Sequence, residues 1–562
     1  MVLQGYRLSS EALTAHGLRA TPVISAEAEG LPAITVAILR FWQRFPKAVD
    51  VGRTIAIGLL PNQFPDVHEL QPGEQITEQF VMTIGGDAIG ELPLGWVHAP
   101  SRVSASPDWY CQAGAVSYLT TEATDPNREY VALVNRALDP ERGFKARREV
   151  IDEYGWRNFG DLYADHEAVF HHGAKPLISH YNNQYDAIAG FAVHFFRSGD
   201  ARWLELLCDL ARHVVDIDVY HTREDKSAYS GGLFWHTNHH VDAGTSTHRT
   251  YPRQAKGSGG PSAEHNYSTG LLLHYFLTGD PGARTAAIEL ADWVIAMDDG
   301  SRTPLRWVSR APTGLASATG TMSYHGPGRG PGNSIVVLIN AWRLTRSRIY
   351  LEKADELIRR CAHPCEDLDA LNLLDAERRW YYTVFLQSLS RYLDCKADLG
   401  ELDDSYGYSR ATLLHYARWM ERHERPYLDE PERLEFPNET WVAQEMRKAE
   451  VLGLAGTFAS DSDERSRFHA RARFFFEYVM STLPSMETAA FTRPLVLLLT
   501  NGYSHAYFLS HSSELPCAQG PDTFPERVAF VSQRQAAVRR VTVAGACTGV
   551  LLLLALVFWL AR

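Results

Sequence analysis

Amphipathic helical segments follow one another in pairs from about residue 180 to residue 510 of this 562-residue chain. The segments share an apolar period of 3.6 residues, and the pairs cover residues 183–218, 267–298, 333–361, 377–422 and 439–481. The first segments of the two leading pairs end in Gly-Asp, at Gly199-Asp200 and Gly279-Asp280. Glycine takes the left-handed position that ends a helix, and aspartate caps the next helix. Such a series of helical hairpins predicts a solenoid or a closed α/α toroid.

Residues 1–150 have a different pattern, which is typical of β structure. Three short β-branched or alternating runs, at residues 34–39, 54–60 and 79–84, are separated by Pro, Gly, Asn and Asp. We therefore predict a multidomain β + α protein. A β-sandwich domain is expected at residues 1–150 and an α/α toroid catalytic domain at residues 151–510.

An uncharged run of 20 residues lies at the C-terminal end, from Val541 to Leu560. Because this length crosses a bilayer as a helix, we predict a single-pass transmembrane helix at residues 541–560, after a linker at residues 511–540. The arginines that precede the run favour a cytoplasmic main body. An outward-facing body is the alternative, and the first residues lack the pattern of a secretory signal. The sequence is compatible with a main body on either side of the membrane.

The formal net charge of −12 argues against a broad nucleic-acid surface, so no nucleic-acid partner is expected. This charge does not exclude an anionic sugar, which needs only a few local Arg or Lys residues. The seven cysteines are sparse and odd in number, so they predict neither a disulfide framework nor a zinc site.

Histidines concentrate in one stretch, from Tyr154 to Leu273, together with Trp, Tyr, Asn, Arg and Asp. Thirteen of the 23 histidines lie between His166 and His274. Each buried polar group must find a partner or cost free energy, so a core made for packing alone does not need this mixture. Such a composition between helical segments is typical of an acid/base site that binds sugar, and we predict the active site here.

One reaction fits these residue types well, namely β-elimination at a uronic acid. An Asn, Arg or protonated His must offset the charge of the sugar carboxylate so that the enolate-like intermediate can form. A His or Tyr then removes the C5 proton, and a second acid protonates the leaving O4. We predict five catalytic residues for these roles: His236, His239, Tyr267, Arg249 and Asn182.

The competing interpretations of these residues are structural. The histidines would bind loop backbone, Tyr267 would line a helix start, and Asn182 would cap the helix that follows it. Nine further residues are expected to bind the substrate: Arg157, Asp161, Asp165, His166, Tyr181, Trp235, Glu264, His265 and Arg329. For Asp161, Asp165 and His166, the alternative is a buried network that fixes the loops.

No metal site is predicted, because the histidines at positions 236, 239 and 240 have no Cys or carboxylate at a matching spacing. No cofactor is expected, and calcium is kept as the one alternative.

Several sequence blocks resemble those of a known family. They are FWQRFPKAV (41–49), HELQPGEQ (68–75), YGWRNFGDLYADHE (154–167), HYNNQYD (180–186), GLFWHTNHH (232–240) and GGPSAEHNYSTGLL (259–272). In this order they resemble the exo-type rhamnogalacturonan lyases, the PcRGLX/YetA-like group of polysaccharide lyase family 26. The resemblance implies a β-sandwich followed by an α/α toroid, and elimination on the galacturonate-rhamnose backbone of pectin. Members usually carry a further N-terminal β-domain, which this chain is expected to lack.

The expected function is therefore that of a membrane-anchored lyase whose partner is a uronate-containing polysaccharide, with rhamnogalacturonan as the leading substrate. One alternative is a glycoside hydrolase on the same toroid, with Asp161, Asp165 or Glu264 as acid and base. The other is a non-catalytic, membrane-tethered protein that binds carbohydrate.

Overall fold

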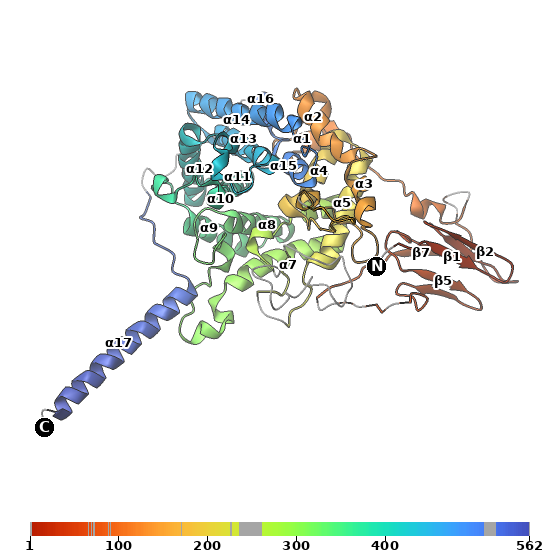
Figure 1. Ribbon diagram of the computed structural model, residues 1–562, viewed down its shortest axis with the longest axis horizontal. Coiled ribbons are helices and arrows are strands. Elements are labelled where there is room, and N and C mark those ends of the chain that lie inside the picture. The colour runs from red at the N-terminus through yellow and green to blue at the C-terminus, as the bar shows by residue number, and fades with distance from the viewer. Residues whose placement is uncertain are drawn as a thin grey trace.

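The chain has three parts in the computed structural model: a small N-terminal β region, a largely helical body and one apolar C-terminal helix that projects from the body (Figure 1). The structure describes residues 3–510, apart from 66, 69, 71–72, 88, 90–91, 170, 225–227 and 235–260, and residues 524–560.

The β region contains three small antiparallel sheets. They are β1 (Tyr6–Ser9) with β2 (Thr14–Gly17), β3 (Val23–Ala26) with β4 (Ile34–Ile38) and β7 (Phe80–Ile84), and β5 (Ala48–Val51) with β6 (Ile55–Gly58). The three predicted strands are confirmed as β4, β6 and β7. The region's own core is small and contains Ala37, Leu94 and Val97. Contacts with the helical body also stabilise the β region. Arg40, which follows β4, forms an ion pair with Asp209 of the body at 2.8 Å.

Residues 107–151 differ from the predicted β-domain, because they form helices. These are α1 (Pro107–Ala113), α2 (Arg128–Asn135) and α3 (Phe144–Ile151). All three helices pack on the helical body. Helix α1 packs on α4, α2 packs on α15, and Phe144 of α3 lies against Phe191 of α4. Helices of seven or eight residues are too short for an apolar period to stand out in the sequence.

The predicted helical pairs are confirmed. They are α4 (Ala187–Ser198) with α5 (Ala201–His213), α6 (Thr269–Thr278) with α7 (Pro281–Asp298), α8 (Arg329–Thr345) with α9 (Arg348–Cys361), α11 (Tyr382–Asp398) with α12 (Asp404–His423), and α13 (Glu439–Phe458) with α14 (Ser462–Thr482). The short α10 (Ala376–Arg379) precedes α11, and α15 (Thr492–Asn501) and α16 (His505–Ser510) follow the last pair. Gly199 and Gly279 are left-handed, with φ of 72° and 73°, and the aspartate after each caps the next helix.

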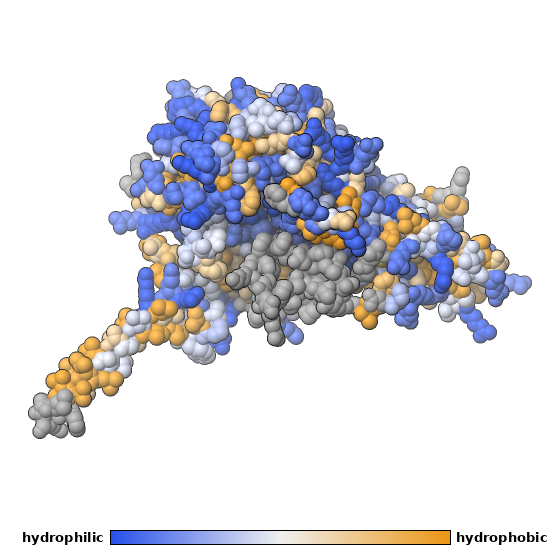
Figure 2. Space-filling view, viewed as in Figure 1, coloured by the Kyte–Doolittle hydropathy of each residue, from blue (hydrophilic) through white to orange (hydrophobic). Residues whose placement is uncertain are grey.

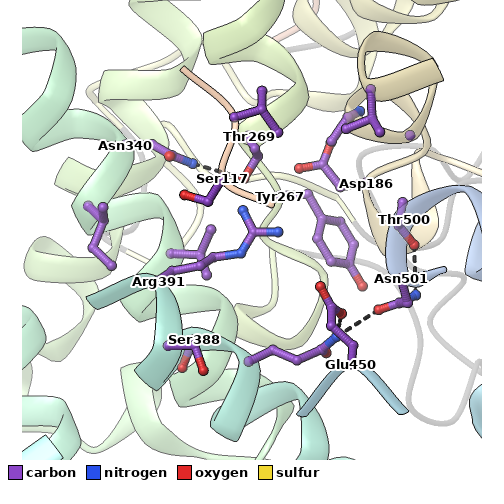
Figure 3. A pocket seen from close by; sticks show the side chains of 18 of the residues that line it. Ser117, Asp186, Tyr267, Thr269, Asn340, Ser388, Arg391, Glu450, Thr500 and Asn501 are labelled. Atoms are coloured by element: carbon purple, nitrogen blue, oxygen red, sulfur yellow. Dashed lines mark hydrogen bonds between the residues drawn. The ribbon is translucent and has the colours of Figure 1, made fainter. Parts of the chain in front are cut away.

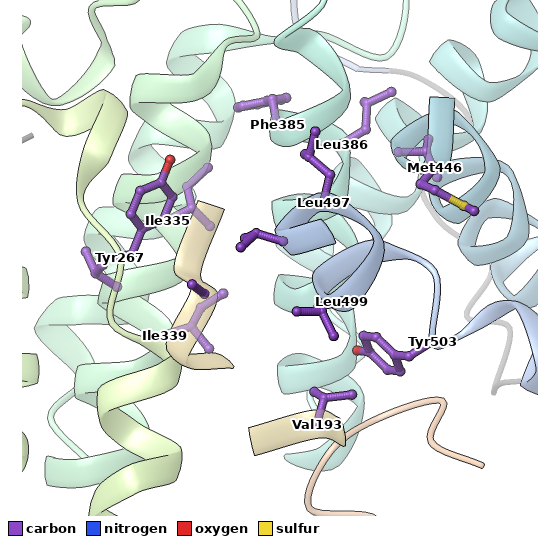
Figure 4. Packing of buried hydrophobic residues seen from close by; sticks show 14 of the residues in the cluster. Val193, Tyr267, Ile335, Ile339, Phe385, Leu386, Met446, Leu497, Leu499 and Tyr503 are labelled. Atoms are coloured by element: carbon purple, nitrogen blue, oxygen red, sulfur yellow. The ribbon is translucent and has the colours of Figure 1, made fainter. Parts of the chain in front are cut away.

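The first helices of the pairs, together with α15, contact one another in a closed order. Helix α4 packs on α6, α6 on α8, α8 on α11, α11 on α13, α13 on α15, and α15 returns to α4. The second helix of each pair packs against its partner. Figure 4 shows the apolar side chains between these helices, with Leu497 of α15 near Phe385 and Leu386 of α11, and Leu499 near Tyr503. The inner six helices therefore surround a common interior.

Helix α17 (Gln533–Leu560) is long and apolar enough to cross a membrane. Its most apolar window has a mean hydropathy of 2.1, and none of that window is buried. The helix starts within the predicted linker. The described residues before it, 524–532, pack on the body, where the ring of His363 lies 2.8 Å from the carbonyl oxygen of Pro525. The phenyl ring of Phe530 likewise lies 4.3 Å from the guanidinium carbon of Arg360.

Candidate functional site

A cavity of about 160 Å³ lies inside the ring of inner helices. Its walls come from α4, α6, α8, α11, α13 and α15, together with residues 115–118. Figure 3 shows Tyr267, Arg391 and Glu450 directed into this space, from the segment just before α6, from α11 and from α13. Four arginines and three carboxylates line it: Arg329, Arg343, Arg391, Arg447, Asp186, Asp394 and Glu450. The cavity therefore brings several charged side chains together inside an otherwise apolar core.

A strained turn before α4 presents Tyr185 to the cavity. The backbone is left-handed at Asn182, Asn183, Tyr185 and Asp186, with φ between 53° and 60°. Non-glycine residues adopt this conformation rarely, and bulky ones more rarely still. The carboxylate of Asp186 stabilises the turn, since it accepts the backbone N–H groups of Ala189 at 3.3 Å and Gly270 at 3.2 Å. The turn thus joins the starts of α4 and α6 and fixes the position of Tyr185.

The ring of Tyr185 lies between two arginines. The guanidinium carbon of Arg329 is 4.9 Å from the ring centre, and that of Arg447 is 5.0 Å away. Gln444 donates a hydrogen bond to the Tyr185 hydroxyl at 3.2 Å. Burial alone would raise the pKa of Tyr185, but the positive charges of Arg329, Arg493 and Arg447 outweigh it and lower the pKa. A lowered pKa increases the fraction of Tyr185 that is deprotonated at a given pH, and the phenolate is the form that acts as a general base.

A second tyrosine, Tyr267, also contacts Arg329, but its pKa is shifted in the opposite direction from that of Tyr185. Arg329 donates from Nε to the Tyr267 hydroxyl at 3.2 Å, and that hydroxyl donates to the carbonyl oxygen of Glu264 at 3.4 Å. Burial raises the pKa of Tyr267 despite the arginine. Two neighbouring groups whose environments shift their pKa values in opposite directions form a candidate base and acid.

The rest of the wall holds these arginines in place. Arg447 donates to Gln387 at 2.7 Å and to Gln444 at 2.9 Å. Gln387 also bonds to Glu450, and burial raises the pKa of Glu450 to about 7. At the far side, burial raises the pKa of Asp394 to about 6. The four arginines outnumber the three carboxylates that line the cavity, and this excess of positive charge favours an anionic ligand.

A separate buried network lies between the β region and the helical body. Nδ1 of His180 is 2.9 Å from Glu153 and 3.6 Å from Asp161, and all three side chains are buried. Burial lowers the pKa of His180, but the two carboxylates outweigh this effect and raise it to about 10. Burial also raises the pKa of Glu153 to about 7. These features are typical of an ion-pair network that fixes a fold.

The same three side chains are the candidate metal ligands within the described residues, since their ligand atoms lie within 4.8 Å of one another. A metal requires a deprotonated imidazole. The carboxylates hold the proton on His180 over the neutral pH range, so the donor set fits an ion pair better than a metal site.

Only some of the residues predicted from the sequence line the cavity. Tyr267 and Arg329 do so. Glu264 and His265 are next to them: Glu264 accepts the N–H of Gly320 at 2.9 Å, and the ring of His265 lies edge-on to Tyr267. Trp235, His236, His239 and Arg249 lie outside the described residues.

The other predicted residues are held in structural contacts. Asn182 donates from its backbone N–H to Asp161 at 3.1 Å, so both belong to the buried network. Asn182 does not cap α4, because the N-cap is Asp186, and Asn183 accepts the N–H of Ile188 at 3.1 Å. The remaining contacts are Asp165 with Arg147 at 2.8 Å, Arg157 with Glu74 at 3.1 Å, and His166 edge-on to the buried ring of Tyr181. These contacts match the loop-fixing alternative that the sequence had left open.

Sequence reasoning missed Tyr185, Arg447, Gln387 and Glu450. The last three lie inside helices α11 and α13, more than one hundred residues after the histidine-rich stretch. One signal was present, because α13 carries Gln444, Arg447 and Glu450 within a segment that is otherwise apolar on the same side. Polar residues on a buried helix face need partners and often mark a functional cavity.

No protein-family model matches this chain, and no curated protein matches it with significant similarity.

Proposed function

We propose that this protein is a polysaccharide lyase that cleaves a uronate-containing polysaccharide by β-elimination, with rhamnogalacturonan as the leading substrate. The observation that carries the proposal is the position of Tyr185 between Arg329 and Arg447, beside Tyr267. An anion site and a base/acid pair in one cavity are what elimination at a uronate requires.

The closed order of helix contacts supports an α/α toroid as the catalytic domain. In such a ring the axial cavity is the natural place for a site, because loops from every hairpin reach it. The described starts of α4, α6 and α8 meet there through Tyr185, Tyr267 and Arg329. Positive ends of helix dipoles add to the field of the arginines and favour a carboxylate.

The proposed reaction follows from these positions. Arg329 and Arg447 bind the uronate carboxylate, which makes the C5 proton more acidic. Tyr185 as phenolate takes the C5 proton, and the electron pair of that C–H bond forms the C4=C5 double bond. The C4–O4 bond breaks as Tyr267 donates its proton to the leaving O4. His236 and His239, on the connection between α5 and α6, keep their proposed role as alternative proton-transfer groups.

We also propose that α17 anchors the enzyme in a membrane as a single-pass helix. Its length and its exposed apolar surface support this assignment.

The experiment is incubation of the full-length protein with rhamnogalacturonan oligosaccharides. A lyase produces an unsaturated uronate that absorbs in the ultraviolet, and Tyr185→Phe should remove most of this signal.

A glycoside hydrolase is the second candidate, and the raised pKa of Glu450 favours it, since a buried carboxyl that titrates near 7 can serve as a general acid. A hydrolase would release reducing sugar without ultraviolet absorbance, and a protein that only binds carbohydrate would release neither.

A further inference from the structure

The base of α17 is fastened to one surface turn of the helical body. The turn is the short helix η9 (Pro304–Trp307) with the residues beside it, and η9 contacts α17. Gln533 at the start of α17 donates to the carbonyl oxygen of Ser309 at 2.7 Å, and Thr303 donates to Gln533 at 2.6 Å. About two turns further along the helix, Arg540 donates to the carbonyl oxygen of Val308 at 2.6 Å. Contacts at both positions fix the turn against the helix.

These contacts place the turn at the level where the apolar run begins. Arg540 is the last charged residue before Val541, and no charged residue follows until Arg562. If α17 spans a bilayer, the membrane surface lies close to Arg540, because charged side chains avoid the hydrocarbon and arginines gather at its edge. Val308 and Trp307 then lie at the headgroup level.

The composition of this surface fits that position. Trp307 is 80% exposed, and Leu305 beside it is also exposed. The same turn and the first residues of α17 carry six exposed arginines: Arg302, Arg306, Arg310, Arg534, Arg539 and Arg540. Residues 299–310 and 532–540 contain one acidic residue, Asp299, in a protein whose net charge is −12. Figure 2 shows hydrophilic and hydrophobic residues side by side where α17 meets the body.

We propose that Leu305, Trp307 and these six arginines form a second membrane-binding surface, which binds anionic phospholipid headgroups of the bilayer that α17 enters. Tryptophan is enriched at the membrane interface, and arginines close to an anionic leaflet are attracted to it. The inference rests on the proposed membrane span and goes beyond it, because it fixes the orientation of the body. The connection that carries this surface, residues 299–328, leads directly to Arg329, which lines the cavity.

The test uses the full-length protein in nanodiscs of phosphatidylcholine, with or without phosphatidylglycerol, whose acyl chains are brominated and quench nearby tryptophans. The fluorescence lost in Trp307→Phe reports on Trp307, and that lost in Trp559→Phe reports on the apolar run. Trp109→Phe is the matched control, because Trp109 is also exposed but lies on α1. We expect the Trp307 component to be quenched, and more strongly with phosphatidylglycerol, while the Trp109 component is not.

Charge reversal provides the second arm. Arg306→Glu combined with Arg310→Glu should abolish the effect of phosphatidylglycerol on Trp307 while leaving Trp559 quenched. Equal behaviour of Trp307 and Trp109, with Trp559 quenched, would overturn this inference and leave the membrane span intact. An unquenched Trp559 would overturn the span itself, and with it the surface proposed here.

Discussion

Replacing Tyr185 by phenylalanine separates its chemical role from its packing role. The ring stays between guanidinium groups 4.9 and 5.0 Å away, and the hydroxyl loses one hydrogen bond, from Gln444. Loss of such a bond costs on the order of 1 kcal/mol of stability, so the variant should fold. A positioned base contributes roughly 10²- to 10⁴-fold to the rate. We therefore expect kcat to fall by that factor, about 3–5 kcal/mol in activation free energy.

The assay is the rate of ultraviolet absorbance increase on rhamnogalacturonan oligosaccharides at saturating substrate. Tyr118→Phe is the matched control, since Tyr118 also lines the cavity and its hydroxyl bonds to Asp394 at 2.7 Å. That variant makes the same chemical change away from the arginine pair, and its kcat should stay within a few-fold of wild type. If both variants keep similar activity, Tyr185 is not the base and the reasoning from its pKa is refuted.

Three further predictions follow from the same contacts. In Arg447→Gln the pKa of Tyr185 should rise, because a cation that lowers it is removed, so the kcat/KM profile should shift its rising limb to higher pH; an unchanged limb would exclude Tyr185 as the titrating group. Asp298 is buried, which raises its pKa, but its ion pairs with Arg360 and Lys353, each at 2.8 Å, outweigh burial and hold the pKa at about 2. At ~1.4 kcal/mol per pH unit, its pairing is worth about 2.5 kcal/mol. Because the folded pKa is depressed, this stability is present above the unfolded value near 4 and is lost as pH falls toward 2; urea unfolding should show Asp298→Asn destabilised at pH 7 but much less at pH 2.5. Finally, a Cβ at Gly270 would lie 2.4 Å from a side chain of α4, so Gly270→Ala should lower thermal stability by roughly 1–3 kcal/mol, whereas Gly86→Ala, in open space, should not.

The helical pairs were readable from the sequence because their signals are local. Gly199 and Gly279 end their helices, and the aspartates that follow cap the next ones, as the Gly-Asp pattern predicts. The β region was readable only in part. Its strands have few residues, and the helices at residues 107–151 are too short to show a period. Their structure depends on packing against α4 and α15, which the sequence does not display.

The site was readable to a smaller extent. Tyr267 lies just before α6 within the unusual stretch, and Arg329 lies at the start of α8, one helical pair later. The composition of the loops before these helices pointed to both residues. Tyr185 depends on arginines from helices far along the chain, and its environment exists only after the ring closes. Part of the histidine-rich composition has another cause. His180 and Asp161 belong to the buried network between the β region and the body, where polar density stabilises a junction and does not contact the cavity.

Mass spectrometry of the products tests the central claim most directly. β-Elimination breaks the C4–O4 bond without adding water, so the masses of the two products sum to the mass of the oligosaccharide substrate. Hydrolysis adds one water to that sum. We predict products of unchanged total mass, one of them an unsaturated uronate, from the wild-type protein. Products that carry an added water, from the same protein and substrate, would contradict the lyase account.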